Sequence, residues 1–396
     1  SHLQIVSRVV NSKNSLPILD NVLMSVEDGI LKITASDLES TITTTLPLEN
    51  YNGAGVIATD TKKILDVLKE FPEQPLTFNI NTDDKRIDIT SQNGKYTLVG
   101  VDGSDFPQAT QLKADKTISI SVSPDILYGG ITSAIFATGD DELRPIMNGI
   151  FIELQESGIN FVATDAHKLV RYTRKEVKAE TESSFILPKK PANILKTILP
   201  KASDDVILEF DEKNAVFTFG AIRLVCRLLE GVYPNYNSVI PRENPNKLVV
   251  DRVELYNSLR RIGMFASQSS NLVGLKINGN TLEISAQDMD FSISGKEVIN
   301  CQYEGDEMEI GFKSNFLGEI LGNISTSEVT IELSDPSRAG IILPKDNENP
   351  DEDMHGTEGG NDTQDYVFLL SEIEARVYLR SDESKYMIGS AEPTEF

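Results

Sequence analysis

Hydrophobic and polar positions alternate near the start of the chain in a pattern that returns twice. The stretches 15–42, 143–170 and 271–293 each contain an alternating apolar segment, a turn with a glycine, a second alternating segment and an aspartate. Alternation with a period of two is typical of strands that bury one face. Each stretch is therefore predicted to be a two-stranded hairpin that ends in a bend at the aspartate.

A second repeated segment follows each hairpin, over residues 57–80, 186–210 and 310–333. Each copy alternates, changes to apolar positions at helical spacing and then alternates again, which predicts strand, helix and strand. A closing strand follows in the first two copies, at 96–107 and 222–234. Segments that recur in the same order indicate duplication, because chance similarity does not keep register over whole units. The predicted fold class is α+β, with three tandem similar domains.

Polar stretches near residues 113 and 242 separate the repeats. The first copy begins inside the helix that opens the other two, so domain 1 is expected to be N-terminally incomplete. An acidic stretch without apolar periodicity predicts a solvated loop in domain 3. The predicted limits are 1–113 for domain 1, 114–242 for domain 2, 243–375 for domain 3 with the acidic loop at 345–364, and 376–396 for a tail of unknown role.

The helices that open domains 2 and 3 have marked starts. Ser123 as N-cap and Pro124 at the first helical position predict a helix whose apolar face includes Leu127. Asp251 is the predicted cap of the equivalent helix in domain 3, with Leu255 on its apolar face.

The composition is that of an ordinary soluble globular protein, with 39% hydrophobic and 25% charged residues. No apolar run approaches the roughly 18 residues of a membrane span. Cys226 and Cys301 alone cannot build a disulfide framework, so we expect a reduced, cytoplasmic location and no membrane partner. The net charge of −24 disfavours tight binding of nucleic acid through a broad basic surface, but it does not exclude a protein that holds DNA without gripping it.

The stretch ATDAHKLV, residues 163–170, suggests an active site because Thr164, Asp165 and His167 lie so close together. Aspartates also stand at the equivalent positions of the other repeats, so Asp165 is predicted to shape a bend by accepting from backbone N–H groups. His167 is peculiar to domain 2, and the sequence places no nucleophile or second carboxylate beside it. No catalytic residue is predicted. An acid/base enzyme centred on Asp165 and His167 is a disfavoured alternative, and a binding role for His167 stays open.

Motifs for metals and cofactors are missing from the sequence. The acidic loop fails as a calcium loop because Pro350 and Asp351 stand where a ligand and a glycine are needed. Cysteine and histidine spacings do not resemble a zinc site, and the glycine motifs for phosphates and dinucleotides do not occur. We expect no metal, no cofactor and no enzymatic activity.

Basic residues recur on matching predicted helices. Lys62 and Lys63 lie on the helix of domain 1, and Lys189, Lys190 and Lys196 lie on or beside its equivalent in domain 2. Any single lysine is best explained as part of a solvated face. Their repetition in an acidic chain favours one positive surface on an otherwise negative body.

Five stretches, LPILDNVLMSVEDGILKITASDLE, RPIMNGIFIE, ATDAHKLV, EGVYPNYNSVIP and EMEIGF, together with the threefold repeat, resemble the bacterial DNA sliding clamp, the β subunit of the replicative DNA polymerase III holoenzyme. The resemblance runs from about residue 3 to residue 370. It implies a head-to-tail homodimer that closes a ring of six domains, with helices inside and sheets outside. It also implies a non-catalytic processivity factor that encircles double-stranded DNA and tethers polymerase subunits, the clamp loader and other replication and repair proteins.

The resemblance assigns residues to three surfaces. A hydrophobic cleft for a linear motif of partner proteins would use Met147, Thr164, His167, Lys168, Leu169, Pro234, Val239, Lys313 and Phe316. The DNA-facing positions, together with the helical lysines, are Lys13, Lys62, Lys63, Arg144, Lys189, Lys190 and Lys196. The dimer would join Tyr96 and Leu98 of one chain to Met264 and Phe265 of the other.

Two departures from the family pattern affect these surfaces. Pro145 and Ile146 stand where the family has two tyrosines, so an aromatic contact with DNA is absent there. After DYVFLL the family usually ends in a Met-Pro-apolar segment, where this chain has Ser371–Glu374 and a longer tail. Acids in an apolar cleft carry a desolvation cost, so either the cleft is remodelled or the end of the chain is not the native one. The alternative from another class is a three-repeat peptide- or carbohydrate-binding protein of the cell surface that does not bind DNA.

Overall fold

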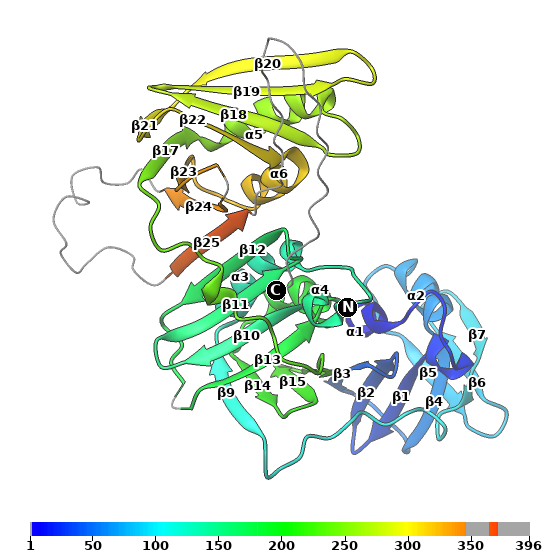
Figure 1. The fold of residues 1–396 in the computed structure, drawn as a ribbon. Helices are drawn as coiled ribbons and strands as arrows, with labels where there is room; N and C mark the ends of the chain where they lie inside the picture. The colour runs from blue at the N-terminus through cyan, green and yellow to red at the C-terminus, as the bar shows by residue number, and fades with distance from the viewer. Residues whose placement is uncertain (1, 180, 337, 346–363, 371–396) are drawn as a thin grey trace. The chain divides into compact units, whose positions relative to one another are not determined.

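The computed structural model describes residues 2–179, 181–336, 338–345 and 364–370 (Figure 1). The chain divides into an N-terminal unit of Ser1–Thr132 and Ser183–Glu230 and a C-terminal unit of Ser133–Glu182 and Gly231–Phe396. Most of the predicted acidic loop (346–363) and the end of the chain (371–396) lie outside the described residues.

A nine-stranded sheet forms the body of the N-terminal unit, in the order β8-β4-β1-β2-β3-β16-β15-β14-β9. The first five of these strands come from the first repeat and the last four from the second. The two repeats are joined where Thr43 of β3 lies opposite Arg223 of β16. The strands are β1 (Asn21–Glu27), β2 (Ile30–Ser36), β3 (Ser40–Pro47), β4 (Gly55–Asp60), β8 (Val101–Asp102), β9 (Ile118–Val122), β14 (Val206–Phe210), β15 (Asn214–Phe219) and β16 (Ile222–Arg227).

The rest of this unit consists of a small sheet and the helices. The sheet β5-β6-β7 contains β5 (Thr77–Asn81), β6 (Arg86–Thr90) and β7 (Lys95–Val99). The helices are α1 (His2–Val6), η1 (Ser7–Val9), η2 (Pro17–Asp20), α2 (Thr61–Lys69), α4 (Lys189–Ile198) and η5 (Leu199–Lys201), with β13 (Ser183–Pro188) before α4. The chain passes between the two units within α3 (Pro124–Ala134), which continues into η3 (Ile135–Ala137).

The C-terminal unit, like the N-terminal unit, contains one large sheet and one small sheet, and its small sheet has four strands. Strands of the large sheet pair in the order β10-β11-β12-β25-β24-β23-β17-β21, and those of the small sheet in the order β20-β19-β18-β22. Val170 of β12 lies opposite Phe368 of β25, where the second repeat joins the third. The strands are β10 (Gly149–Gln155), β11 (Gly158–Thr164), β12 (Lys168–Arg174), β17 (Asn246–Asp251), β18 (Leu272–Asn278), β19 (Thr281–Asp288), β20 (Ile293–Asn300), β21 (Gln302–Glu304), β22 (Met308–Lys313), β23 (Glu328–Leu333), β24 (Gly340–Lys345) and β25 (Gln364–Leu370).

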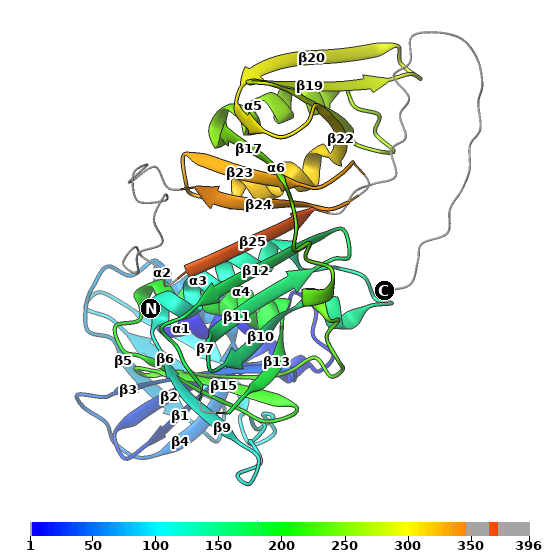
Figure 2. The same cartoon turned by 60° about the vertical axis from the view of Figure 1, so that its left-hand side comes forward.

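Two helices fill the space between sheets in the C-terminal unit. Both views show α5 (Arg252–Ile262) and α6 (Ser314–Gly322) between the sheet of β18–β20 and β22 and the strands β17, β23 and β24 (Figures 1 and 2). Leu255 and Leu259 of α5 and Leu317 and Ile320 of α6 are buried there. Short helices η4 (Pro145–Asn148), η6 (Tyr236–Ser238) and η7 (Gly263–Phe265) complete the unit.

The predicted hairpins and helix starts are confirmed. The turn of β1–β2 contains Gly29 at φ +75° and that of β18–β19 contains Gly279 at φ +55°, a region that favours glycine because it has no Cβ. The helix α5 begins after Asp251, whose carboxylate accepts from the Glu254 backbone N–H at 2.7 Å. Leu127 of α3 is fully buried. The turn glycines and the helix caps in the sequence therefore predict where these hairpins and helices begin and turn.

Two of the strands that end a sheet within the described part of the chain are equivalent to strands that join one repeat to the next. The strand β7 pairs with β6 alone, and β20 pairs with β19 alone. By the repeat, β7 corresponds to β16 and β20 corresponds to β3 and β12, which are the strands that join one repeat to the next. Val99 on β7 is 75% exposed and Val298 on β20 is 57% exposed. Unpaired edges with exposed apolar side chains are ready to pair with another chain.

Candidate functional site

The bend between β11 and β12 is held by its own polar side chains. One carboxylate oxygen of Asp165 accepts from the backbone N–H groups of His167 and Lys168, both at 2.9 Å. The Thr164 hydroxyl donates to the Lys168 carbonyl at 2.8 Å and accepts from the Ala166 N–H at 3.1 Å. These bonds fix Ala166 at φ +76°, a conformation that alanine rarely adopts.

The same bend occurs in the other repeats. Asp37 accepts from the N–H groups of Glu39 and Ser40 at 3.0 and 2.6 Å. Asp288 accepts from those of Asp290 and Phe291 at 3.0 and 3.3 Å. The predicted structural role of the repeated aspartate is therefore confirmed, and Asp165 is not set apart as a catalytic group.

Lys168 is the residue that distinguishes the bend of the second repeat from that of the first. Its side chain is only 6% exposed, and its ammonium contacts Asp165 at 2.7 Å and Glu319 of α6 at 3.0 Å. Burial alone lowers the pKa of Lys168, but hydrogen bonds and charge attraction with the two carboxylates outweigh it, so the pKa lies above its ordinary value. Ser40 occupies the equivalent position in the first repeat, which therefore has no such lysine.

An aromatic ring from the third repeat covers this bend. The rings of Phe316 and His167 stack at 5.6 Å between centroids and 20° between planes. The ammonium groups of Lys168 and Lys313 lie 4.6 and 5.2 Å from the centre of the Phe316 ring. Cations at this distance from a ring are attracted by its negative face. Phe316 is thus held between two lysines and a histidine.

The pKa of His167 is lowered, which favours the uncharged imidazole at neutral pH. Burial is the largest cause that lowers the pKa of His167 below its ordinary value. The charge of Asp165 opposes the lowering, whereas Lys313 and Arg144 add to it. A neutral imidazole offers one donor and one acceptor nitrogen, which suits hydrogen bonds to an extended peptide.

The other residues of the predicted cleft have different surroundings. Met147 of η4, Thr164 and Leu169 are buried, whereas Pro234 and Val239 flank η6 and are half-buried. Four of the predicted cleft residues, His167, Lys168, Lys313 and Phe316, form ring and cation–ring contacts with one another. Of the predicted cleft residues, His167 is the one that is exposed.

Residues that the sequence did not single out build the support of this site. Tyr236 of η6 donates to Glu153 of β10 at 2.6 Å. Tyr233 stacks on Phe151 of β10, with 4.7 Å between centroids and 5° between planes. These contacts hold the segment with Pro234 against β10. The aromatic residues around this short polar turn are a weak sequence signal for a supporting contact. The sequence around Glu319 contains no signal that it pairs with Lys168.

The predicted DNA-facing residues differ in how far their side chains are exposed and in whether they pair with an acid. Lys13, Lys62 and Lys63 are exposed, and Lys196 is half-buried on α4. Arg144, in the C-terminal unit, is exposed but forms an ion pair with Asp141 at 2.9 Å. Their contact with DNA stays a prediction.

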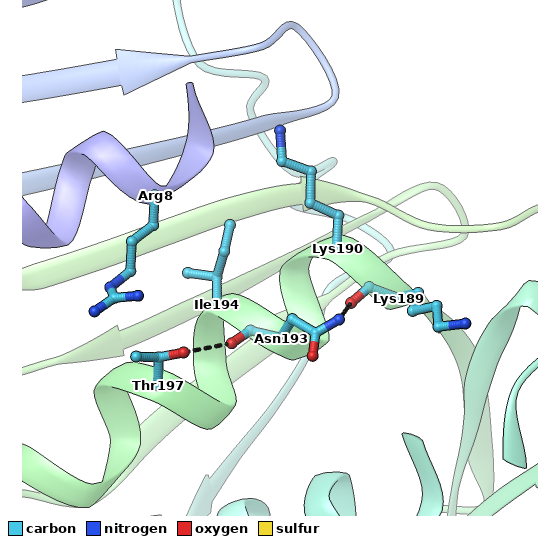
Figure 3. A pocket seen from close by; sticks show the side chains of 6 residues that line it. All are labelled: Arg8, Lys189, Lys190, Asn193, Ile194 and Thr197. Carbon is cyan, nitrogen blue, oxygen red and sulfur yellow. Dashed lines mark hydrogen bonds between the residues drawn. The ribbon is translucent and has the colours of Figure 1, made fainter. Parts of the chain in front are cut away.

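The half-buried Lys190 is held by three acceptors of the N-terminal unit. Its ammonium donates to the Val9 carbonyl and to the Asn11 amide oxygen, both at 2.6 Å, and to the carboxylate of Asp37. The Asp37 side chain is 5% exposed, so the charge of Lys190 is balanced by a buried anion. Lys189, its neighbour, points in another direction (Figure 3).

The predicted dimer residues lie on or beside the edge strands β7 and β20. Tyr96 and Leu98 are on β7. Met264 and Phe265 are on η7, which packs on β20, since a Cβ added at Gly295 would lie 2.7 Å from the Phe265 ring. Met264 is 71% exposed.

Metal and membrane sites are not apparent in the parts of the chain that can be described. No group of three or more His, Cys, Asp or Glu residues there could hold a metal ion. No helix among those same residues is long and apolar enough to cross a membrane.

Three tandem repeats of this kind, joined strand to strand and presenting the equivalents of the joining strands at the edges β7 and β20, define a DNA-clamp subunit. Family models match each repeat in chain order: the N-terminal domain of the DNA polymerase III beta subunit at residues 1–110, the central domain at 121–235 and the C-terminal domain at 237–355. The chain belongs to the bacterial beta sliding clamp family, the beta subunit of DNA polymerase III.

Individual relatives agree over nearly the whole chain. The beta sliding clamp of Synechococcus elongatus is 30% identical over 352 residues, which cover 86% of this chain and 92% of the relative. That of Pseudomonas aeruginosa is 26% identical and covers 88% and 94%. Among solved structures, the DnaN sliding clamp of Bartonella birtlesii bound to griselimycin has a TM-score of 0.81 at 26% identity and covers 94% and 96%.

The Pseudomonas aeruginosa clamp structure bound to griselimycin has a TM-score of 0.84 at 24% identity and covers 94% of this chain and 96% of its own, which shows the same fold. These matches confirm the α+β fold of three tandem domains and the resemblance found in the sequence. They do not favour the alternative of a cell-surface repeat protein.

Proposed function

We propose that two copies of the chain form a ring around double-stranded DNA and serve as the processivity factor of a DNA polymerase. The ring slides along DNA and tethers the polymerase, the clamp loader and other replication and repair proteins. The protein acts without catalysis and in the cytoplasm.

The pattern of strand junctions is the observation that carries the ring. The first repeat joins the second through β3 and β16, and the second joins the third through β12 and β25. In the third repeat the strand equivalent to β3 and β12 is β20, which lies at the edge of its sheet. In the first repeat the strand equivalent to β16 is β7, which also lies at the edge of its sheet. Pairing β20 with β7 of a second copy continues the same junction, and two identical junctions close a head-to-tail dimer.

The site around His167 and Phe316 supports the tethering role. It lies where β12 of the second repeat meets α6 of the third, and junctions between repeats are common places for binding sites. An extended peptide from a partner would bond to His167 and place an apolar anchor against Phe316. The remaining predicted cleft residues would shape the wall behind it.

Retention on closed DNA tests the ring. The protein, loaded on nicked circular DNA by a clamp loader, is expected to stay bound at salt concentrations that release it from the same DNA after linearisation. Simple electrostatic binding would weaken equally on both forms as salt rises. Equal loss from circular and linear DNA would overturn the ring.

A further inference from the structure

An open hollow of about 530 Å³ lies in the N-terminal unit beside the exposed face of α4 (Figure 3). Three of its lining residues are basic and none is acidic, although the chain has a net charge of −24. Such a local reversal of charge favours an anionic ligand. The lining residues are Arg8, Lys189, Lys190, Asn193, Ile194 and Thr197.

Lys190 lines the hollow and ties two of its segments together. Its bonds to Val9, Asn11 and Asp37 hold η1 against α4, and Arg8 is the residue before Val9. The ammonium of Lys190 is occupied by these acceptors, so its part is to position the segment that carries Arg8.

Arg8 is the cation best placed to meet a ligand. Its side chain is exposed and extends toward the face of α4 that carries Asn193 and Thr197 (Figure 3). Among the described residues, no carboxylate forms an ion pair with Arg8. Asn193 and Thr197 are also exposed, but each donates to a backbone carbonyl one turn earlier on α4, at 3.0 and 2.9 Å. A guanidinium with five donors, and with no anionic partner in the described part of the chain, matches the oxygens of a phosphate.

The size of the hollow decides which anion fits. Pockets for ligands larger than a simple ion measure about 300–1,000 Å³. The hollow falls in this range and is open along α4, with Arg8 and Lys189 at opposite ends of it (Figure 3). An extended phosphodiester backbone fills such a shape better than an isolated phosphate ion.

We propose that Arg8 binds a backbone phosphate of double-stranded DNA in this hollow, with Lys190 as the positioning residue. The proposal rests on the function proposed above, because it adds one contact to the DNA-binding surface of the ring. Phosphate contacts of this kind hold DNA in register without selecting its sequence.

Fluorescence anisotropy with a short labelled linear duplex tests the contact over a series of low salt concentrations. The Arg8→Ala variant is expected to bind about two- to fivefold more weakly, which is the worth of one exposed charge pair. The slope of log affinity against log salt should become shallower by about 0.9, as for the loss of one phosphate contact. The matched control is Arg223→Ala, an exposed arginine on β16 of the same unit, which should match wild type.

Arg8→Ala with the affinity and salt slope of Arg223→Ala would overturn the proposal, and so would a wild-type chain that does not bind the duplex at any salt. Retention on circular DNA is measured separately. Its loss would defeat the ring, whereas normal retention with an unchanged Arg8→Ala affinity would defeat this contact alone.

A double-mutant cycle tests the role of Lys190. Lys190→Met should weaken duplex binding as much as Arg8→Ala does, and the double variant should lose little more, because both changes remove the same contact. Additive losses would show that Lys190 acts independently of Arg8 and would overturn its positioning role.

Discussion

At the scale of single residues, the equivalent aspartates of the first two bends pair with different lysines. Lys190 is tied to Asp37, whereas the equivalent aspartate of the second repeat, Asp165, is tied to Lys168 from its own bend. The first junction therefore uses a lysine from the next repeat. In the second repeat the bend aspartate pairs with a lysine of its own bend, and the ring of Phe316 lies against His167 of that bend.

Removal of the Lys190 ammonium should destabilise the N-terminal unit. Lys190→Met leaves the buried carboxylate of Asp37 without its cation, which costs about 1–3 kcal/mol. Lys196→Met on the same helix is the control, since it removes a lysine of equal size without an ion partner among the described residues. Chemical denaturation of both variants measures the difference, and equal stabilities would contradict the role given to the Asp37–Lys190 pair.

The lowered pKa of His167 makes the stability of the C-terminal unit depend on pH. The unfolded state has the ordinary value of 6.5, so it binds more protons than the folded state below that pH. Stability from this group is full above pH 6.5 and falls as pH decreases through the lower folded pKa. His167→Gln removes this dependence, so its melting temperature should approach that of wild type as pH decreases from 7.5 to 5.5. A difference that stays constant over this range would show that His167 does not titrate as described.

At the scale of elements, α6 and the β11–β12 bend form one binding wall. Leu169 and Met147 are buried, so aspartate at either position would disturb the fold as well as the binding of a partner. Phe316 is half-buried and offers a cleaner change.

Phe316→Ala should weaken the binding of a Gln/Leu/Phe-type clamp-binding peptide by about 2 kcal/mol, the usual loss for a central aromatic contact. Calorimetry measures the affinity. Phe291→Ala is the control because Phe291 is 71% exposed and lies on the bend of the third repeat. A peptide that binds Phe316→Ala and wild type equally would remove this wall from the proposed site.

At the scale of the whole molecule, the proposed ring depends on the β7 and β20 edges. Phe265 packs on β20 within its own chain, so its replacement would also disturb the monomer. Met264 is 71% exposed beside it, and Met264→Asp would bring an uncompensated charge into the interface without loss of internal packing.

Met264→Asp is expected to run as a monomer of 43.7 kDa in sizing columns at concentrations where wild type runs at twice that mass. Val232→Asp, at a 90% exposed apolar position that belongs to neither β7, η7 nor β20, should remain dimeric. A dimeric Met264→Asp protein would place the junction elsewhere.

The limits of prediction from the sequence follow from the distance over which each interaction acts. Hairpins, the Gly29 turn, the Asp251 cap and the bend at Asp165 depend on neighbours a few residues apart, so the sequence by itself determined them, and their repetition determined the three domains. The ion pairs of Asp37 with Lys190 and of Lys168 with Glu319, and the joining of β3 to β16, connect residues more than a hundred positions apart. Only the tertiary structure decided which lysine is buried, which remains exposed, and which strand edges are left free, because burial and pairing depend on chain segments that no local pattern brings together.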